Sequence, residues 1–207
     1  MDGIELRWRL TNPLYVYRGA HGNVTCAAVT STLELASGDA LGGVARWTVE
    51  QGKLLEREEC NEQDRGVLAI NTHGGETWIH RRDGSVTSSK GHSFLCGDMS
   101  FCKMTVIERG GRLYGAVPSV TGSDAVDIWD LREHKRLAVI VAEEKKSGPV
   151  MVIRLSFVEE SKIRMIAGYD DGVVRCYHVD LADGCSSEVG RSKLFPMTGK
   201  LVFMQKV

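Results

Sequence analysis

The sequence lacks the segments that would carry a protein into or across a membrane. Its first residues, MDGIELRWRLTNPLYVYRG, have neither the apolar core of a secretory signal nor the acid-poor, Arg- and Ser-rich character of a transit peptide. Nowhere do 18 apolar residues follow one another. We therefore expect a protein of the cytoplasm and nucleus, with no membrane partner.

An excess of charge of one sign is also missing. Lysine and arginine total 26 against 27 acidic residues, so the formal net charge is -1. Binding to nucleic acid through a broadly basic surface is therefore not expected. The six cysteines include no CxxC pair, and in an intracellular chain they are expected to be reduced thiols, several of them packed as small apolar residues.

Sequence motifs of catalysis and cofactor binding are absent as well. The chain contains no GxSxG, no GxxxxGK[ST], no HExxH and no DxDxDG pattern. The adjacent carboxylates Asp170 and Asp171 stand before a glycine, where they could bind a metal or form a hairpin turn. We favour the turn, because no further ligands lie at suitable spacing. His21 and His92 similarly lack partners at zinc-ligand spacing, so we predict no catalytic residue, no cofactor and no metal.

The chain has only 4 prolines, with 23 glycines and many short runs rich in Val, Ile, Tyr or Trp. Glycine and aspartate turn signals such as RDGS, RGGR, GSD and DDG separate these runs, and this pattern predicts antiparallel hairpins. The expected strands are VTCAAV, GVARWTV, GVLAIN, TWIHR, KMTVIE, LYGAV, AVDIWDL, LAVIVA, MVIRLSFV, RMIAGY and VVRCYHV.

These hairpins repeat along the chain. Four turn residues, Gly42, Gly84, Asp124 and Gly172, each lie five residues before an aromatic residue or its replacement. Their successive spacings are 42, 40 and 48 residues. A period near 40 to 45 is typical of four-stranded propeller blades. The five-residue offset assigns structural repeat positions to Trp47, Ser89, Trp129 and Tyr177.

The repeats resemble the WD40 family, in which a strand ends in Trp-Asp downstream of a Gly-His dipeptide. Trp129 and Asp130 form the only intact Trp-Asp pair, and His21 stands in GAHGNV. The resemblance implies an all-β WD40 propeller with about four recognisable blades. It also implies that Asp171 is a turn residue of the kind that often bonds an upstream histidine.

A narrower resemblance covers roughly residues 14 to 181. The fragments VPSVTGSDAVDI and AGYDDG are similar to the family of guanine nucleotide-binding protein subunit β-like protein 1, divergent WD-repeat proteins that include a subunit of the ASTRA assembly. Members run to seven blades, so we expect four blades of an incomplete ring, with a rarer closed ring of four blades as the alternative. We divide the chain into an N-terminal extension at 1–13, WD40 repeats at 14–181 and a divergent tail at 182–207.

The resemblance implies a non-enzymatic scaffold that contacts other proteins during cochaperone-assisted assembly of phosphatidylinositol-3-kinase-related kinases. The alternative is a WD40 adaptor that reads a peptide or histone tail, or a substrate receptor of a ubiquitin ligase. Interface hot spots favour Trp, Tyr and Arg. The candidate partner contacts are Trp78, Tyr169, Arg81 and Arg82.

Overall fold

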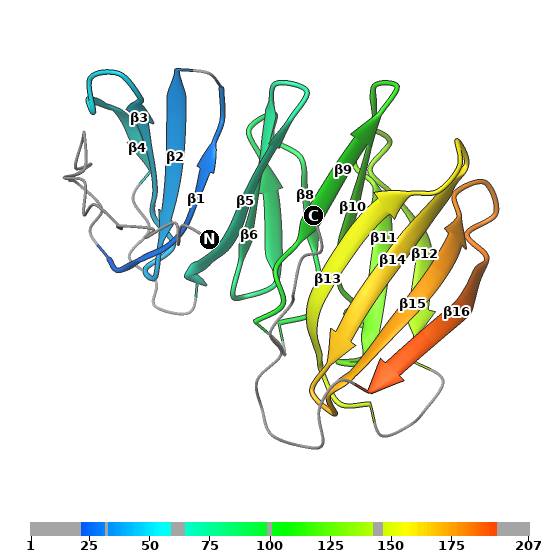
Figure 1. The fold of residues 1–207 in the computed structure, drawn as a ribbon. Helices are drawn as coiled ribbons and strands as arrows, with labels where there is room; N and C mark the ends of the chain where they lie inside the picture. The colour runs from blue at the N-terminus through cyan, green and yellow to red at the C-terminus, as the bar shows by residue number, and fades with distance from the viewer. Residues whose placement is uncertain (1–21, 32, 59–64, 99–100, 143–146, 194–207) are drawn as a thin grey trace, which may run out of the picture.

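Four antiparallel sheets of four strands each make up the described part of the chain (Figure 1). The computed structural model describes residues 22–31, 33–58, 65–98, 101–142 and 147–193. Within them, no helix is long and apolar enough to cross a membrane. The predicted extension at 1–13 and His21 lie outside the described residues.

Each sheet is one blade, and its strands follow one another in chain order from the inner to the outer edge. Blade 1 contains β1 (Val24–Val29), β2 (Glu34–Asp39), β3 (Val44–Thr48) and β4 (Leu54–Glu58). Blade 2 contains β5 (Val67–His73), β6 (Glu76–Arg81), β7 (Ser85–Ser88) and β8 (Ser93–Leu95). Blade 3 contains β9 (Thr105–Arg109), β10 (Arg112–Pro118), β11 (Ala125–Asp130) and β12 (Lys135–Val141). Blade 4 contains β13 (Val150–Phe157), β14 (Lys162–Tyr169), β15 (Val173–Asp180) and β16 (Ser186–Lys193).

The blades stand side by side in an arc, with β1 beside β5, β5 beside β9 and β9 beside β13 (Figure 1). The expected all-β propeller with about four blades is thereby confirmed, and the described blades are part of such a ring. The number of blades in a complete ring stays a prediction.

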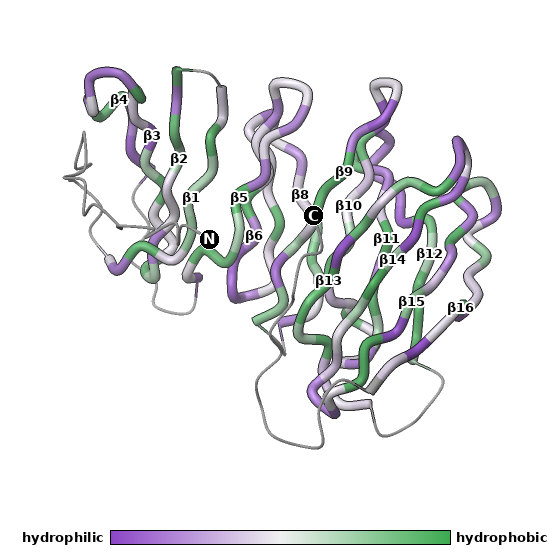
Figure 2. The backbone as a smooth tube through the Cα atoms, viewed as in Figure 1, coloured by the Kyte–Doolittle hydropathy of each residue, from purple (hydrophilic) through white to green (hydrophobic). Residues whose placement is uncertain are grey.

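Hydrophobic cores lie between neighbouring blades, because the sheets pack face to face. Figure 2 shows hydrophobic stretches along strands such as β13 and β14, while the hairpin turn between β3 and β4 is hydrophilic. Ile128, Ile153 and Met165 belong to the core shared by blades 3 and 4. Trp78 and Leu113 belong to the core shared by blades 2 and 3. Burial of these faces is the main force that stabilises the arc.

Blade 4 extends beyond the predicted boundary at residue 181. The sequence prediction assigned 182–207 to a divergent tail, but β16 pairs with β15 along its length, from Val179 opposite Ser186 to Val173 opposite Lys193. The correction follows from pairing: a polar outer strand needs only backbone hydrogen bonds to join a sheet. Residues 194–207 lie outside the described residues.

Candidate interaction surface

The turns that join the second and third strands of all four blades lie at one end of the sheets, which we call the turn face. Figure 1 shows this end at the bottom. The turns are neighbours: Gly97 N, next to the turn of blade 2, donates to Pro118 O in blade 3, and Val150 N in blade 4 donates to Ser123 O.

Three of these turns share one geometry, as the sequence repeat predicted. Gly42, Gly84 and Gly172 have φ of 90°, 77° and 79°, in the left-handed region that glycine adopts without strain. Each glycine N–H donates to the carbonyl three residues earlier, at 3.2, 3.2 and 3.0 Å. The structure places these three glycines at turn positions.

Aspartates stabilise the turns, and in the sequence motif it is Asp171 that has this structural role. Asp171 Oδ1 accepts a hydrogen bond from Val173 N at 2.9 Å. In blade 1, Asp39 Oδ1 accepts from Leu41 N and Gly43 N, both at 2.9 Å. Asp39 Oδ2 also accepts from Gly22 N at 3.3 Å, which connects the turn to the segment before β1. These are the bonds by which aspartate stabilises a turn.

The aromatic repeat positions lie in or beside the cores. Trp47 and Tyr177 are 2% and 3% exposed. Trp47 Nε1 donates to Ser37 Oγ at 3.2 Å. Trp129 is half-buried and stacks on Phe94 with ring centroids 4.3 Å apart. Trp129 and Tyr177 thus supply packing between blades, while Trp47 is buried in blade 1.

Asp130 caps the turn that follows Trp129, and Ser89 takes the aromatic position of blade 2. Asp130 Oδ1 accepts from Arg132 N and Glu133 N at 2.9 and 3.0 Å. Ser89 Oγ accepts from Thr77 N at 3.1 Å. Both side chains satisfy backbone donors, so their role is to hold hairpins together.

Three of the four candidate partner contacts are buried, and this corrects the sequence prediction. Trp78 and Tyr169 are both 0% exposed. The Arg81 side chain is also buried, where Nη1 donates to Thr87 Oγ1 at 2.9 Å and Nη2 lies 3.5 Å from Glu58 of blade 1. The Trp78 and Tyr169 side chains lie in the cores between blades, and Arg81 lines the groove between blades 1 and 2, where it is paired with Glu58. Only Arg82 is exposed.

The exposed Arg82 lies on the turn face beside an aromatic ring that the sequence prediction missed. Its guanidinium carbon is 5.1 Å from the centroid of the Phe101 ring, and Phe101 is 64% exposed. Leu95 and Val120 are also exposed, at 68% and 58%. The sequence prediction did not include Phe101 because it followed the hot-spot preference for Trp, Tyr and Arg, to which phenylalanine does not belong.

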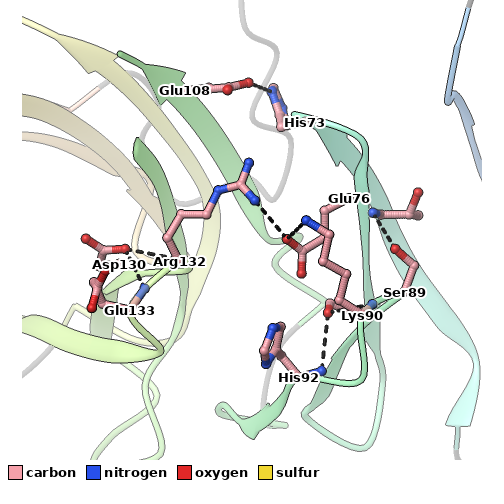
Figure 3. A network of polar contacts seen from close by, with 11 residues as sticks. His73, Glu76, Ser89, Lys90, His92, Glu108, Asp130, Arg132 and Glu133 are labelled. Atoms are coloured by element: carbon pink, nitrogen blue, oxygen red, sulfur yellow. Dashed lines mark hydrogen bonds and ion pairs between the residues drawn. The ribbon is translucent and has the colours of Figure 1, made fainter. Parts of the chain in front are cut away.

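Polar contacts join blades 2 and 3 at the opposite end of the sheets (Figure 3). Arg132 Nη1 reaches from the β11–β12 turn to Glu76 Oε2 on β6 at 3.3 Å, and Lys90 Nζ lies 3.4 Å from the same oxygen. His73 Nδ1 lies 4.0 Å from Glu108 Oε2. Because Glu76 is 2% exposed, both cations neutralise a carboxylate that water does not reach.

A groove of about 660 Å³ separates the outer strands of blades 1 and 2. Its charges are already paired: Arg46 Nε donates to Glu56 Oε2 at 3.1 Å, and Arg81 contacts Glu58. These pairs occupy the charges that a ligand would need, so the groove offers no obvious charged subsite.

A buried imidazole and thiol lie between blades 2 and 3 without the properties of a catalytic pair. His80 Nδ1 accepts from Met104 N at 3.2 Å, which requires the proton on Nε2, 3.2 Å from Cys96 Sγ. Burial, followed by the field of nearby carboxylates, raises the pKa of Cys96 to about 12. At neutral pH the sulfur is therefore a thiol and not a nucleophilic thiolate.

His80 is expected to make folding sensitive to mild acid. Burial lowers the pKa of His80 from 6.5 to about 4. Below pH 6.5 the unfolded chain takes up a proton that the folded chain excludes, so the free energy of unfolding falls by up to about 3 kcal/mol by pH 4. Urea unfolding at pH 7.0 and 4.5 measures this loss.

The matched variant for this test is His80→Asn, whose Oδ1 can still accept from Met104 N. The loss between the two pH values should be smaller in the variant than in the parent by most of that amount. Equal losses in both proteins would assign the acid sensitivity to other groups. A His80 resonance, identified by its absence from His80→Asn, that titrates near pH 6.5 in the folded parent would contradict the prediction directly.

The described residues contain no group of three His, Cys, Asp or Glu side chains placed to hold a metal ion. Cys102 is also a thiol at neutral pH, because burial raises its pKa to about 12. The arrangement that the described chain does offer is an exposed set of turns on a rigid set of blades, which is suited to contact with other molecules.

Comparison with known proteins identifies the same architecture. No protein-family profile matches the chain. ASTRA-associated protein 1 of Penicillium rubens is 24% identical over 216 residues, covering 80% of this chain and 49% of that protein. The chain thus spans about half the length of the curated relative it matches.

Among solved structures, the WD40 domain of Toxoplasma gondii coronin has a TM-score of 0.62 and 18% identity, covering 87% of this chain and 48% of that one. The RRP9 WD40 repeats have a TM-score of 0.58 and 17% identity, covering 84% and 53%. At these identities the likenesses show the WD40 propeller fold alone.

Proposed function

We propose that this WD40-repeat protein, similar to ASTRA-associated protein 1, is a non-catalytic scaffold for protein assembly in the cytoplasm and nucleus. The similarity over 80% of the chain is the observation that carries the proposal. More specifically, the scaffold takes part in cochaperone-assisted assembly of phosphatidylinositol-3-kinase-related kinases. The earlier resemblance of VPSVTGSDAVDI and AGYDDG to the subunit β-like family supports this finer step.

The turn face is the proposed contact surface. Arg82 and Phe101 are exposed together there, with the guanidinium over the ring. Arginine and aromatic side chains supply much of the binding energy in protein interfaces, and an arginine placed on a ring is partly ordered before binding. The surrounding turns are held by internal hydrogen bonds, so a partner would meet a surface that is already formed.

Affinity purification of the tagged full chain from cells tests the proposal. We expect large kinases of the named class and their cochaperones among the recovered proteins. Arg82→Ala should reduce their recovery several-fold, because it removes an exposed hot-spot candidate without opening a core. Arg112→Ala is the matched control, since Arg112 is an exposed arginine at the opposite end of the sheets.

The outcomes separate the general proposal from the specific one. Recovery of other protein partners without any such kinase or cochaperone would overturn the specific role and keep the scaffold. Recovery of no partner at all would overturn both. An equal loss of partners with Arg82→Ala and Arg112→Ala would place the contact away from the turn face.

A further inference from the structure

The turn face contains a preformed cavity of about 310 Å³ at the junction of blades 2 and 3. Its floor is the segment 95–98, in which Cys96 N donates to Gly84 O at 2.8 Å and Gly97 N donates to Pro118 O at 2.9 Å. A Cβ atom on Gly97 would lie 2.5 Å from the carbonyl oxygen of Ser119. Both blades therefore fix the floor through its backbone, and only glycine fits there.

One wall of the cavity is the β10–β11 loop, which belongs to the VPSVTGSDAVDI fragment. Ser119 Oγ accepts from Thr121 N at 3.1 Å and lies 2.8 Å from Thr121 Oγ1. These bonds order the loop and leave Val120 exposed at its tip, while Leu95 is exposed on the floor segment. Both side chains line the cavity, so an aliphatic group entering it would meet apolar surface.

The charge of the cavity is negative. The charged residues that line it are Asp83 and Asp98, and no lysine or arginine is among the lining residues. Asp83 Oδ2 already accepts from Arg65 Nε at 2.9 Å. Asp98 is exposed and forms no ion pair with another described residue, so its charge is open to a partner.

The thiol of Cys96, in the floor segment, lies close to the same carboxylates. Burial raises the pKa of Cys96, and the carboxylates of Asp127, Asp83 and Asp98 raise it further. Asp127 is fully buried beneath the turn face, with Arg136 Nη1 3.5 Å from its Oδ2.

We propose that this cavity receives one lysine or arginine side chain from a partner protein. The aliphatic part of that side chain lies against Leu95 and Val120, and its cationic end meets the carboxylate of Asp98. An anionic group would be repelled by the carboxylate of Asp98, and a purely apolar group would desolvate Asp98 without replacing its water. The inference rests on the proposed protein-interaction function and names the chemistry of one contact.

Three ten-residue peptides that differ only at their central residue test the cavity. The residue is lysine, norleucine or glutamate, and binding to the isotope-labelled full chain is followed by backbone amide NMR shifts. We expect the lysine peptide to bind about threefold more tightly than the norleucine peptide, with the glutamate peptide weakest. The shifts should map to Asp83, Asp98 and the 119–123 loop.

Variants assign the two parts of the contact. Asp98→Asn should remove the preference for lysine over norleucine, and Val120→Ser should weaken both peptides alike. Glu160→Gln is the control, because Glu160 is an exposed carboxylate in the β13–β14 turn at the opposite end of the sheets. It should leave all three affinities unchanged.

Equal affinity for the three peptides, a preference for glutamate, or shifts that map elsewhere would overturn the proposal. So would the absence of binding at millimolar peptide concentration. None of these results bears on recovery of partners from cells, which tests the scaffold function separately. Conversely, selective lysine binding by a chain that recovers no partner would retain the cavity and remove the proposed function.

Discussion

Trp78→Ala is expected to lower the free energy of unfolding by about 3 to 5 kcal/mol, the usual cost of truncating a buried tryptophan. Trp78 is 0% exposed and packs between blades 2 and 3 beside His92, Phe94 and His134, with ring centroids 6.2 to 6.4 Å away. The truncation would leave a large cavity at that junction. Urea unfolding followed by tryptophan fluorescence and circular dichroism measures the loss.

Two further variants sharpen the Trp78 prediction. Trp78→Phe should cost clearly less than Trp78→Ala, since it retains most of the apolar volume and the indole N–H has no hydrogen-bond partner in the described structure. Phe101→Ala should change stability by no more than about 0.5 kcal/mol, because Phe101 is exposed. If Trp78→Ala left stability intact and reduced only partner recovery, the sequence assignment of Trp78 as a contact would be restored.

The repeated turns could be predicted from the sequence because their chemistry is local. Gly84 and Gly172 require positive φ, and Asp171 bonds its own neighbours, so the signal lies within a few residues. The burial of Trp78 and Tyr169 could not be predicted in this way, because it depends on residues far away in the sequence. Alternation along a strand shows that two faces differ, but in a propeller an inner blade has a neighbouring blade on each face, so alternation does not tell which face is buried.

The remaining errors of the sequence prediction are strands that it did not include. In β2, Gly38 and its small neighbours pack against blade 2, and a Cβ on Gly38 would lie 2.5 Å from a Val67 side-chain atom. Close packing of the two blades therefore requires small residues in β2, and such residues have a low propensity for strands. The other missed strands are outermost in their blades: β4, β8 and β16. Such strands are held by backbone hydrogen bonds to the neighbouring strand, and these bonds do not require a recognisable pattern of side chains.

The cavity at the turn face also depends on contacts that no single segment encodes. Asp83, Leu95 and Val120 come from three different segments, brought together because Cys96 and Gly97 bond to blades 2 and 3. The sequence resemblance includes VPSVTGSDAVDI but predicts no ligand for its loop. The candidate ligand site is formed by this loop together with the floor segment 95–98. Local motifs thus predicted the scaffold, while the candidate contact required the packing of blades.

Arg175 is the residue whose environment departs furthest from what its charge suggests. It is 0% exposed in β15, where Nη2 donates to Ser147 Oγ at 2.9 Å and Nη1 lies 3.5 Å from Glu188 Oε2. Its guanidinium carbon also lies 5.6 Å from the Tyr169 ring centroid. One side chain therefore connects the segment before β13, the end of β14 and the outer strand β16.

Arg175→Leu is expected to destabilise the chain by about 3 to 5 kcal/mol, because it removes the buried cation of Glu188 and leaves, among the described residues, only the more exposed Arg191, whose Nε lies 3.8 Å from Glu188 Oε1. Urea unfolding measures the change, with Arg164→Leu as the control, since Arg164 is exposed on β14 and should shift stability by no more than about 0.5 kcal/mol. Adding Glu188→Leu to Arg175→Leu should recover part of the loss, because the double variant removes the carboxylate whose buried cation the single one takes away.

A cost below about 1 kcal/mol for Arg175→Leu would mean that Arg191 or water compensates Glu188. A double variant less stable than the single one would instead show that the contacts of Arg175 with Ser147 and Tyr169 carry the stabilisation.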